Sequence, residues 1–144
     1  MPYFLLTFTV PEALRVVFQI EPKFAYHLFF AVTAQALREV ALRKLGGEPA
    51  ALGVLHTWSR QLVFHPHVHY IVPGGFLAEN QLRWIRLKDP NFLLPERVLS
   101  RRVRNLFRAR LQAERPDLLA QVPARGWRVE WVVNTQPVGS GERA

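Results

Sequence analysis

The sequence predicts an α+β fold, a mainly antiparallel sheet of about five strands with helices packed on it. Short β-branched and aromatic runs bounded by Pro and Gly are typical of strands. Two longer segments instead repeat apolar residues every three or four positions, as amphipathic helices do. The resulting order is strand, helices, three strands, helix, strand, which favours helices grouped over one face of the sheet.

The first third of the chain predicts a strand followed by two helices. The run YFLLTFTVP (3–11) indicates a buried strand that its final proline ends. A short helix starts there, because proline is accepted in a first turn and Glu12 suits the positive end of the helix dipole. Pro22 opens a longer helix that the Gly-Gly pair at 46–47 ends. Its repeat comprises Phe24, Leu28, Val32, Gln35, Ala36, Glu39 and Val40.

The remaining sequence predicts four strands and one more helix. The segment from about Pro95 to Glu114 has a helical repeat and stops before Pro116. The segment 75–87 contains its own turn near Glu79 and Asn80. The strand segments are 50–59, 67–72, 75–87 and 127–135.

Composition limits the class of protein and its chemistry. A chain of 144 residues that is 49% hydrophobic predicts a single domain with a core of its own. No stretch resembles a membrane span or a secretion signal, so a cytoplasmic location is expected. There is no cysteine, so any metal must be held by nitrogen and oxygen.

The charge favours a nucleic-acid partner. The net charge is +8, and 16 of the 19 basic residues are arginines, whose planar guanidinium matches phosphate oxygens. A genome rich in G and C is the alternative cause of the arginine excess. In the last predicted helix, a single stripe comprises Arg97, Arg101, Arg104 and Arg108. We expect this stripe to contact DNA phosphates, the alternative being a solvated helix face.

Histidines cluster in FHPHVHYIV (64–72). In a strand His67 and His69 point to the same side, with Cα atoms roughly 7 Å apart, and can reach one ion. His56 is a candidate third ligand, because a hairpin centred near 62–63 would place it directly opposite His69. His65 would join this face only if the strand continued through Pro66. The alternative is that the histidines are packing residues, and a structural role is expected for the remaining histidine, in the long helix.

The block HTWSRQLVFHPHVHYIVPGG (56–75) resembles the metal-binding motif of HUH-type transposases, in particular those of the insertion-sequence 91 group, also described as the 801/1294 group. The motif is named for His, a bulky hydrophobe and His, here His67, Val68 and His69. FLLTFTVPEALR is similar to the family's first motif, and the resemblance extends over residues 2–135.

The resemblance implies a five-stranded antiparallel sheet with flanking helices. Two motif histidines and a third polar ligand would bind a divalent metal, Mg or Mn. The partner would be single-stranded DNA at transposon ends, which a tyrosine attacks to give a 5′-phosphotyrosyl intermediate and a free 3′-OH.

The chain departs from the family pattern in its nucleophile. The family's tyrosine lies on a helix after the last strand, whereas the printed sequence ends VVNTQPVGSGERA, and Tyr3, Tyr26 and Tyr70 are expected to be core or surface residues. We therefore expect residues 1–144 to be one HUH transposase-like domain, truncated before the tyrosine-bearing helix, with no catalytic residue of its own. Such a domain would bind metal and DNA weakly and form no covalent adduct, unless a homodimer or partner chain supplies the tyrosine. The alternative function is a non-catalytic nucleic-acid-binding module with structural histidines.

Overall fold

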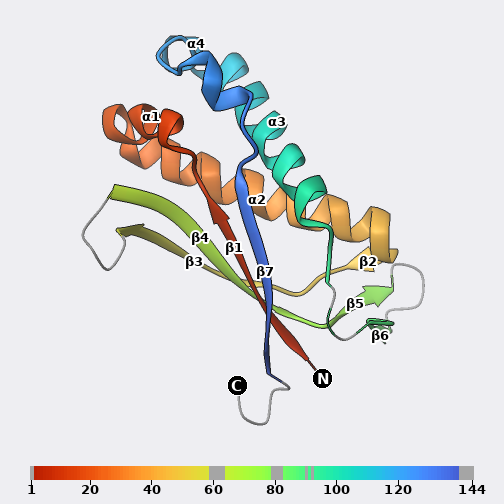
Figure 1. The fold of residues 1–144 in the computed structure, drawn as a ribbon. Coiled ribbons are helices and arrows are strands. Elements are labelled where there is room, and N and C mark those ends of the chain that lie inside the picture. Colours follow the sequence, from red (N-terminus) through yellow and green to blue (C-terminus); the bar gives the residue numbers. More distant parts are fainter. Residues whose placement is uncertain (1, 59–63, 79–82, 90, 92, 140–144) are drawn as a thin grey trace.

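The computed structural model is an α+β structure, as the sequence predicts, and all helices among the described residues lie on one side of the main sheet (Figure 1). It describes residues 2–58, 64–78, 83–89, 91 and 93–139, and of residues 54–58, 64 and 65 the backbone alone. The strands are β1 (Tyr3–Thr9), β2 (Gly47–Glu48), β3 (Leu52–Trp58), β4 (Phe64–Pro73), β5 (Gly75–Ala78), β6 (Trp84–Arg86) and β7 (Val132–Gly139). The helices are η1 (Glu12–Leu14), α1 (Arg15–Ile20), α2 (Pro22–Leu45), α3 (Glu96–Glu114), α4 (Pro116–Leu119) and η2 (Ala124–Trp127).

The strands form two antiparallel sheets rather than one sheet of five strands. The main sheet has the order β3-β4-β1-β7, and a smaller sheet has the order β2-β5-β6. The expected strand at 75–87 is the β5–β6 hairpin, whose turn near residues 79 and 80 lies outside the described residues. The two-residue strand β2, which no pattern predicted, pairs with β5 and closes this smaller sheet.

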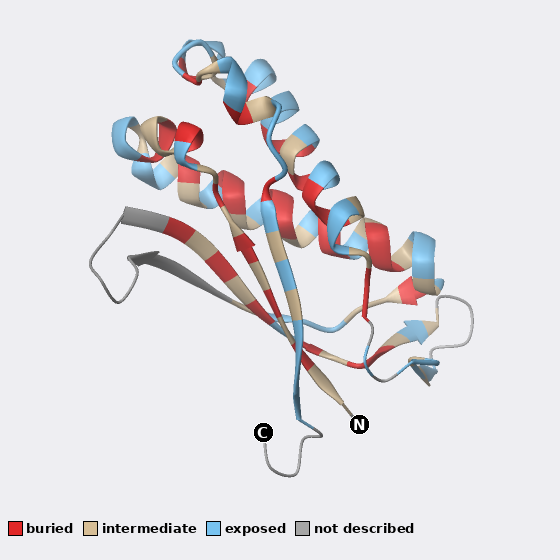
Figure 2. Cartoon of the chain, viewed as in Figure 1, coloured by how far each residue is buried: buried red, intermediate tan, exposed pale blue. Residues whose placement is uncertain are grey.

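Alternation along the central strands separates the core from an open face of the main sheet. Phe4, Leu6 and Phe8 of β1 and Val68 and Tyr70 of β4 are buried under the helices (Figure 2). The residues between them point to the other side of the sheet, because successive side chains of a strand alternate. No described helix covers that side (Figure 1), and we call it the open face.

The core between sheet and helices is aromatic. Phe107 of α3 is fully buried, with its ring centre 6.1 Å from that of Phe18 and 6.4 Å from that of Phe29. α2 ends as predicted, at Gly46, whose φ of 83° is the left-handed conformation that glycine adopts without a steric cost. The predicted helix of residues 95–114 is confirmed as α3.

The last strand begins later than predicted, at Val132 rather than at residue 127. Of its expected first residues, Trp127 is the last residue of the short helix η2, and residues 128–131 follow that helix. Trp131 is 2% exposed, and its Nε1 donates to the carbonyl of Gly126 at 3.0 Å. Burial of this indole against the core therefore outweighs the alternating pattern that predicted a strand there.

β4 is longer than predicted, because it starts at Phe64 and passes through Pro66. His56 pairs with His67, and Trp58 pairs with Phe64, so β4 carries one extra residue in this stretch. Such a bulge is a position at which a strand accepts proline, which has no N–H for the ladder. The helices within the described ranges include none that is long and apolar enough to cross a membrane.

Candidate functional site

His67 and His69 lie together on the open face of the main sheet. Their ring centres are 4.8 Å apart, the ring planes meet at 78°, and both side chains are half-buried. Between them in sequence, Val68 is fully buried on the opposite side. The prediction that the two imidazoles share one face of the strand is therefore confirmed.

Thr7 of the neighbouring strand β1 orients His69. The two residues are register partners, and the Thr7 hydroxyl lies 2.8 Å from the Nδ1 atom of His69. A hydrogen bond at one ring nitrogen fixes which nitrogen remains for another ligand. Nδ1 is engaged by the hydroxyl, so Nε2 is the nitrogen of His69 suited to hold an ion.

The sequence predicted that His56 lies opposite His69, but in the structure it does not. The backbone register pairs His56 with His67 and pairs His69 with Val54. The predicted turn centre, near residues 62 and 63, lies outside the described residues, and the bulge beside Pro66 adds a residue that a simple hairpin does not include. The observed register differs from the predicted one by two residues, so position 56 still belongs to the same face of the sheet as His67. The side chains of His56 and His65 lie outside the description.

The spacing of the histidine pair suits one metal ion. Two imidazoles bound side by side to an ion at about 2.1 Å would hold their ring centres roughly 4.5–5.5 Å apart. The observed 4.8 Å falls within this range. Among the side chains that the structure describes, no group of three His, Asp or Glu suited to an ion occurs. Two side chains of the same row carry an oxygen atom that could bind a metal ion. They are Thr7 of β1 and the exposed Asn134 of the adjacent strand β7.

Sequence reasoning missed Thr7 and Asn134. The alternation of Thr7, Phe8 and Thr9 indicates that both threonines share one face of a strand. It does not indicate that β1 lies between β4 and β7, and only this order brings Thr7 to His69 and Asn134 to Thr7. The sequence therefore indicated which face of β1 carries Thr7, but it did not indicate which strands lie beside β1.

The three tyrosines lie away from the histidine pair. Tyr70 is buried on the opposite side of β4, where its hydroxyl lies 2.8 Å from that of Thr33, and burial raises its pKa. Tyr26 is on α2, with its ring 5.0 Å from that of Phe18. Tyr3 shares the row of Thr7 on β1, but four residues separate them, roughly 13 Å along a strand.

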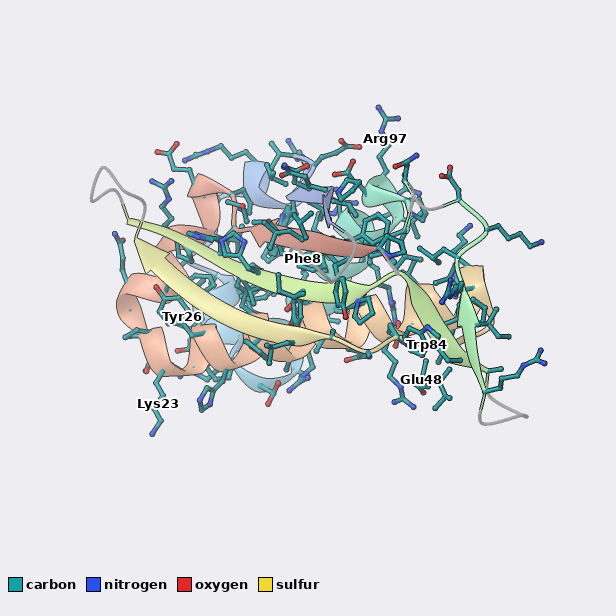
Figure 3. All side chains as sticks on the ribbon, turned by 90° about the horizontal axis from the view of Figure 1, so that it is seen from below. Phe8, Lys23, Tyr26, Glu48, Trp84 and Arg97 are labelled. Carbon is teal, nitrogen blue, oxygen red and sulfur yellow. The ribbon has the colours of Figure 1, made fainter. Side chains whose placement is uncertain are left out.

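The arginine stripe of α3 is exposed on the side of the helix that adjoins the segment before β7. Arg97, Arg101 and Arg108 are exposed, and Arg104 is half-buried. Arg97 extends outward from the molecule (Figure 3) and lies 3.8 Å from a carboxylate oxygen of Glu130. Leu99, Val103, Leu106 and Phe107 are buried, which confirms the predicted apolar face of this helix.

Two of these arginines contact the segment that leads into β7. Arg104 donates to the carbonyl of Val129 at 3.4 Å, and the guanidinium of Arg108 lies 5.6 Å from the ring centre of Trp127. The same segment carries two further exposed arginines. The basic surface therefore comprises Arg97, Arg101, Arg104, Arg108, Arg125 and Arg128. The two arginines outside the helix were missed because helical spacing relates residues of one element only.

The four tryptophans differ in how far their rings are exposed for stacking on DNA bases. Trp131 is buried in the core, and Trp127 stacks on it, with ring centres 6.0 Å apart. Trp84 is 37% exposed on β6, whereas the side chain of Trp58 lies outside the description. Two of the four tryptophans therefore pack against or within the core.

Comparison of the sequence with known proteins identifies a family. Residues 50–144 match the family model described as "Putative transposase". The chain is 44% identical over 112 residues to the putative transposase y4qJ of Sinorhizobium fredii, covering 76% of this chain and 28% of that protein. It is 36% identical over 78 residues to the transposase for insertion sequence element IS801 of Pseudomonas savastanoi pv. phaseolicola, covering 54% of this chain and 18% of that protein. The chain thus spans less than a third of the length of either relative. No solved structure matches.

Proposed function

Because the chain belongs to the putative transposase family, we propose that it serves DNA transposition by holding a divalent metal ion and a single DNA strand at the open face of its sheet. The observation that carries the proposal is the pair formed by His67 and His69, two half-buried imidazoles 4.8 Å apart on a face that no described helix covers. The identity with the IS801 transposase supports the predicted membership of that insertion-sequence group.

In this proposal His67 and His69 hold the ion, and His56 is the candidate third ligand from the row of the pleat that it shares with His67. The family resemblance implies Mg or Mn, whereas imidazole by itself suits softer divalent metals as well. A bound ion would neutralise a phosphate oxygen and stabilise the charge that develops in the transition state of strand cleavage. The hydrogen bond between the Thr7 hydroxyl and Nδ1 of His69 would keep the His69 ring turned toward that position, with Nδ1–H donating to the hydroxyl when Nε2 holds the ion.

The basic surface would hold the DNA backbone. β7 joins the two regions, because its Asn134 adjoins Thr7 while the backbone N–H of Thr135 donates to a carboxylate oxygen of Glu96 on α3 at 2.9 Å. A DNA strand that runs from the histidine pair across β1 and β7 would therefore reach the amino-terminal half of α3. None of the chain's tyrosines adjoins the pair, so the proposal assigns the nucleophile to no residue described here.

Titration of a fluorescently labelled single strand tests the DNA function. We expect affinity that falls steeply with salt and rises when Mn²⁺ is added, because phosphate contacts release counterions and the ion adds one further contact. The Arg101→Gln/Arg104→Gln variant should lower the slope of log affinity against log salt by about 1.4, or roughly 0.7 for each lost contact to a single strand.

Arg110→Gln is the control for charge. Arg110 lies on the same helix and already pairs with Glu114 at 2.7 Å, so its loss should leave the salt slope nearly unchanged. Equal slopes for wild type and the double variant would remove the basic surface from the proposal. Binding that ignores both salt and Mn²⁺ would contradict the DNA function itself.

Replacement of Thr7 by valine tests how the histidine pair is oriented. Valine keeps the shape of threonine but removes the hydroxyl that engages Nδ1 of His69. We expect Mn²⁺ affinity to fall about tenfold to a hundredfold, as for other residues that orient metal ligands, and Thr7→Ser to restore it. Nitrogen-15 NMR of the imidazole, without metal, should show a changed tautomer balance of His69 in the valine variant only. An unchanged balance would exclude the orienting role.

A further inference from the structure

A cavity of about 570 Å³ lies between the carboxyl end of α2, the β5–β6 hairpin and the segment that leads into α3. Its volume is in the range of roughly 300–1,000 Å³ that is usual for small-molecule sites. The apolar part of its lining comprises Leu45, Phe76, Ile85, Leu87, Leu93 and Pro95. Phe76 and Ile85 are register partners and only half-buried, so the pocket keeps apolar surface open to solvent. An aromatic ring beside open apolar surface is suited to stack a planar base.

The mouth of the cavity is cationic. Lys44, Arg86 and Lys88 line it, are exposed, and form no ion pair with any residue that the structure describes. Among the described residues of the lining, the acidic one is Asp89, whose carboxylate oxygen accepts a hydrogen bond from the backbone N–H of Asn91 at 2.9 Å. Three cations around an apolar pocket complement a ligand that has an apolar, planar body and an anionic group.

We propose that this pocket binds one unpaired nucleotide of the DNA strand, with its base against Phe76 and its phosphate at Lys44, Arg86 and Lys88. The inference rests on the proposed DNA function and adds to it a site for a base, which the histidine pair and the basic surface do not provide. Only Gly74 lies between β4 and β5, and Phe76 is seven positions after His69 in the sequence. The two Cα atoms are therefore at most about 25 Å apart, a separation that one DNA strand is long enough to span.

Photocrosslinking locates the base directly. A thymidine dodecamer carrying 5-iodouracil is bound to the whole chain, irradiated and mapped by peptide mass spectrometry. We expect a crosslink at Phe76. The Lys44→Gln/Lys88→Gln variant should lower its yield about fivefold, and both substitutions lie on exposed side chains that leave the fold intact.

The matched control is Arg43→Gln/Arg83→Gln, which removes the same charge from neighbouring exposed positions that do not line the cavity. Its crosslink yield should equal that of the wild type. An equal loss in both double variants would indicate net charge alone and overturn the pocket as the site.

The remaining outcomes separate the pocket from the proposed function. DNA that binds but crosslinks only elsewhere would overturn the pocket and leave the DNA function standing, whereas absence of DNA binding would overturn both. Competition by thymidine monophosphate as tight as by the dodecamer would show a free nucleotide as the ligand and overturn the strand assignment. Equal competition by a glutamate-rich peptide would overturn the choice of a nucleotide.

Discussion

Replacing His67 and His69 together by alanine should abolish the calorimetric heat that wild-type protein gives with Mn²⁺. Loss of a residue that merely orients a metal ligand costs about tenfold to a hundredfold in affinity, so loss of both ligands should exceed about a hundredfold. The double variant should also lose the gain in single-strand affinity that Mn²⁺ gives the wild type, because the ion would no longer link protein and phosphate.

His27→Ala is the control for a general effect of histidine loss. His27 is exposed on α2, which lies on the other side of the sheet from the histidine pair. Its replacement should leave the Mn²⁺ affinity unchanged. A double variant that binds Mn²⁺ as wild type does would identify His67 and His69 as packing residues in edge-to-face contact, and would favour the alternative of a non-catalytic nucleic-acid-binding module. The melting temperatures of all three proteins should agree closely, since these substitutions lie outside the core.

The elements that the sequence predicted correctly are those in which local pattern and packing agree. α2 begins at a proline and ends at a glycine in the left-handed conformation, and α3 buries the apolar face that its spacing predicts. The segment from 127 to 131 has an alternating pattern typical of a strand, but tertiary packing of Trp131 decides its conformation. The third strand of the smaller sheet, β2, is too short to give any periodic signal.

The candidate site was predictable to the extent that it belongs to one strand. The spacing of His67 and His69 fixes their common face, whatever the neighbours of β4 are. The position of His56 depends on the bulge in β4 near Pro66, and the contribution of Thr7 depends on the order of strands in the sheet. Both are relations between strands that are distant in sequence or joined irregularly, and alternation within one strand carries no information about them.

The arginine stripe of α3 was also predictable only in so far as it belongs to one element. Helical spacing placed four of them in one stripe, and the structure leaves three exposed. It also engages Arg104 and Arg108 with Val129 and Trp127, so the stripe is a partly ordered surface rather than a row of independent charges. Because these two side chains are already partly ordered, Arg104 and Arg108 would lose less side-chain entropy on binding phosphate.

Phe107→Ala should have the largest effect on stability. The ring is fully buried and lies within 5.4–6.4 Å, centre to centre, of those of Phe18, Phe29 and Trp131, so its removal leaves a cavity where α1, α2, α3 and the segment before β7 meet. Truncation of a buried phenylalanine typically lowers the free energy of unfolding by about 3–5 kcal/mol. For a chain of this size that corresponds to a fall in melting temperature of roughly 10–20 °C.

Urea unfolding followed by circular dichroism measures this effect against Asn105→Ala, an exposed position on the same helix that should change stability by less than about 0.5 kcal/mol. Because Phe107 packs on the helical side of the sheet, folded Phe107→Ala protein should retain the Mn²⁺ affinity of the wild type at low temperature. A large loss of metal affinity in folded protein would mean that the open face depends on the core packing beneath it. A stability change below about 1 kcal/mol would contradict the central position of this ring in the core.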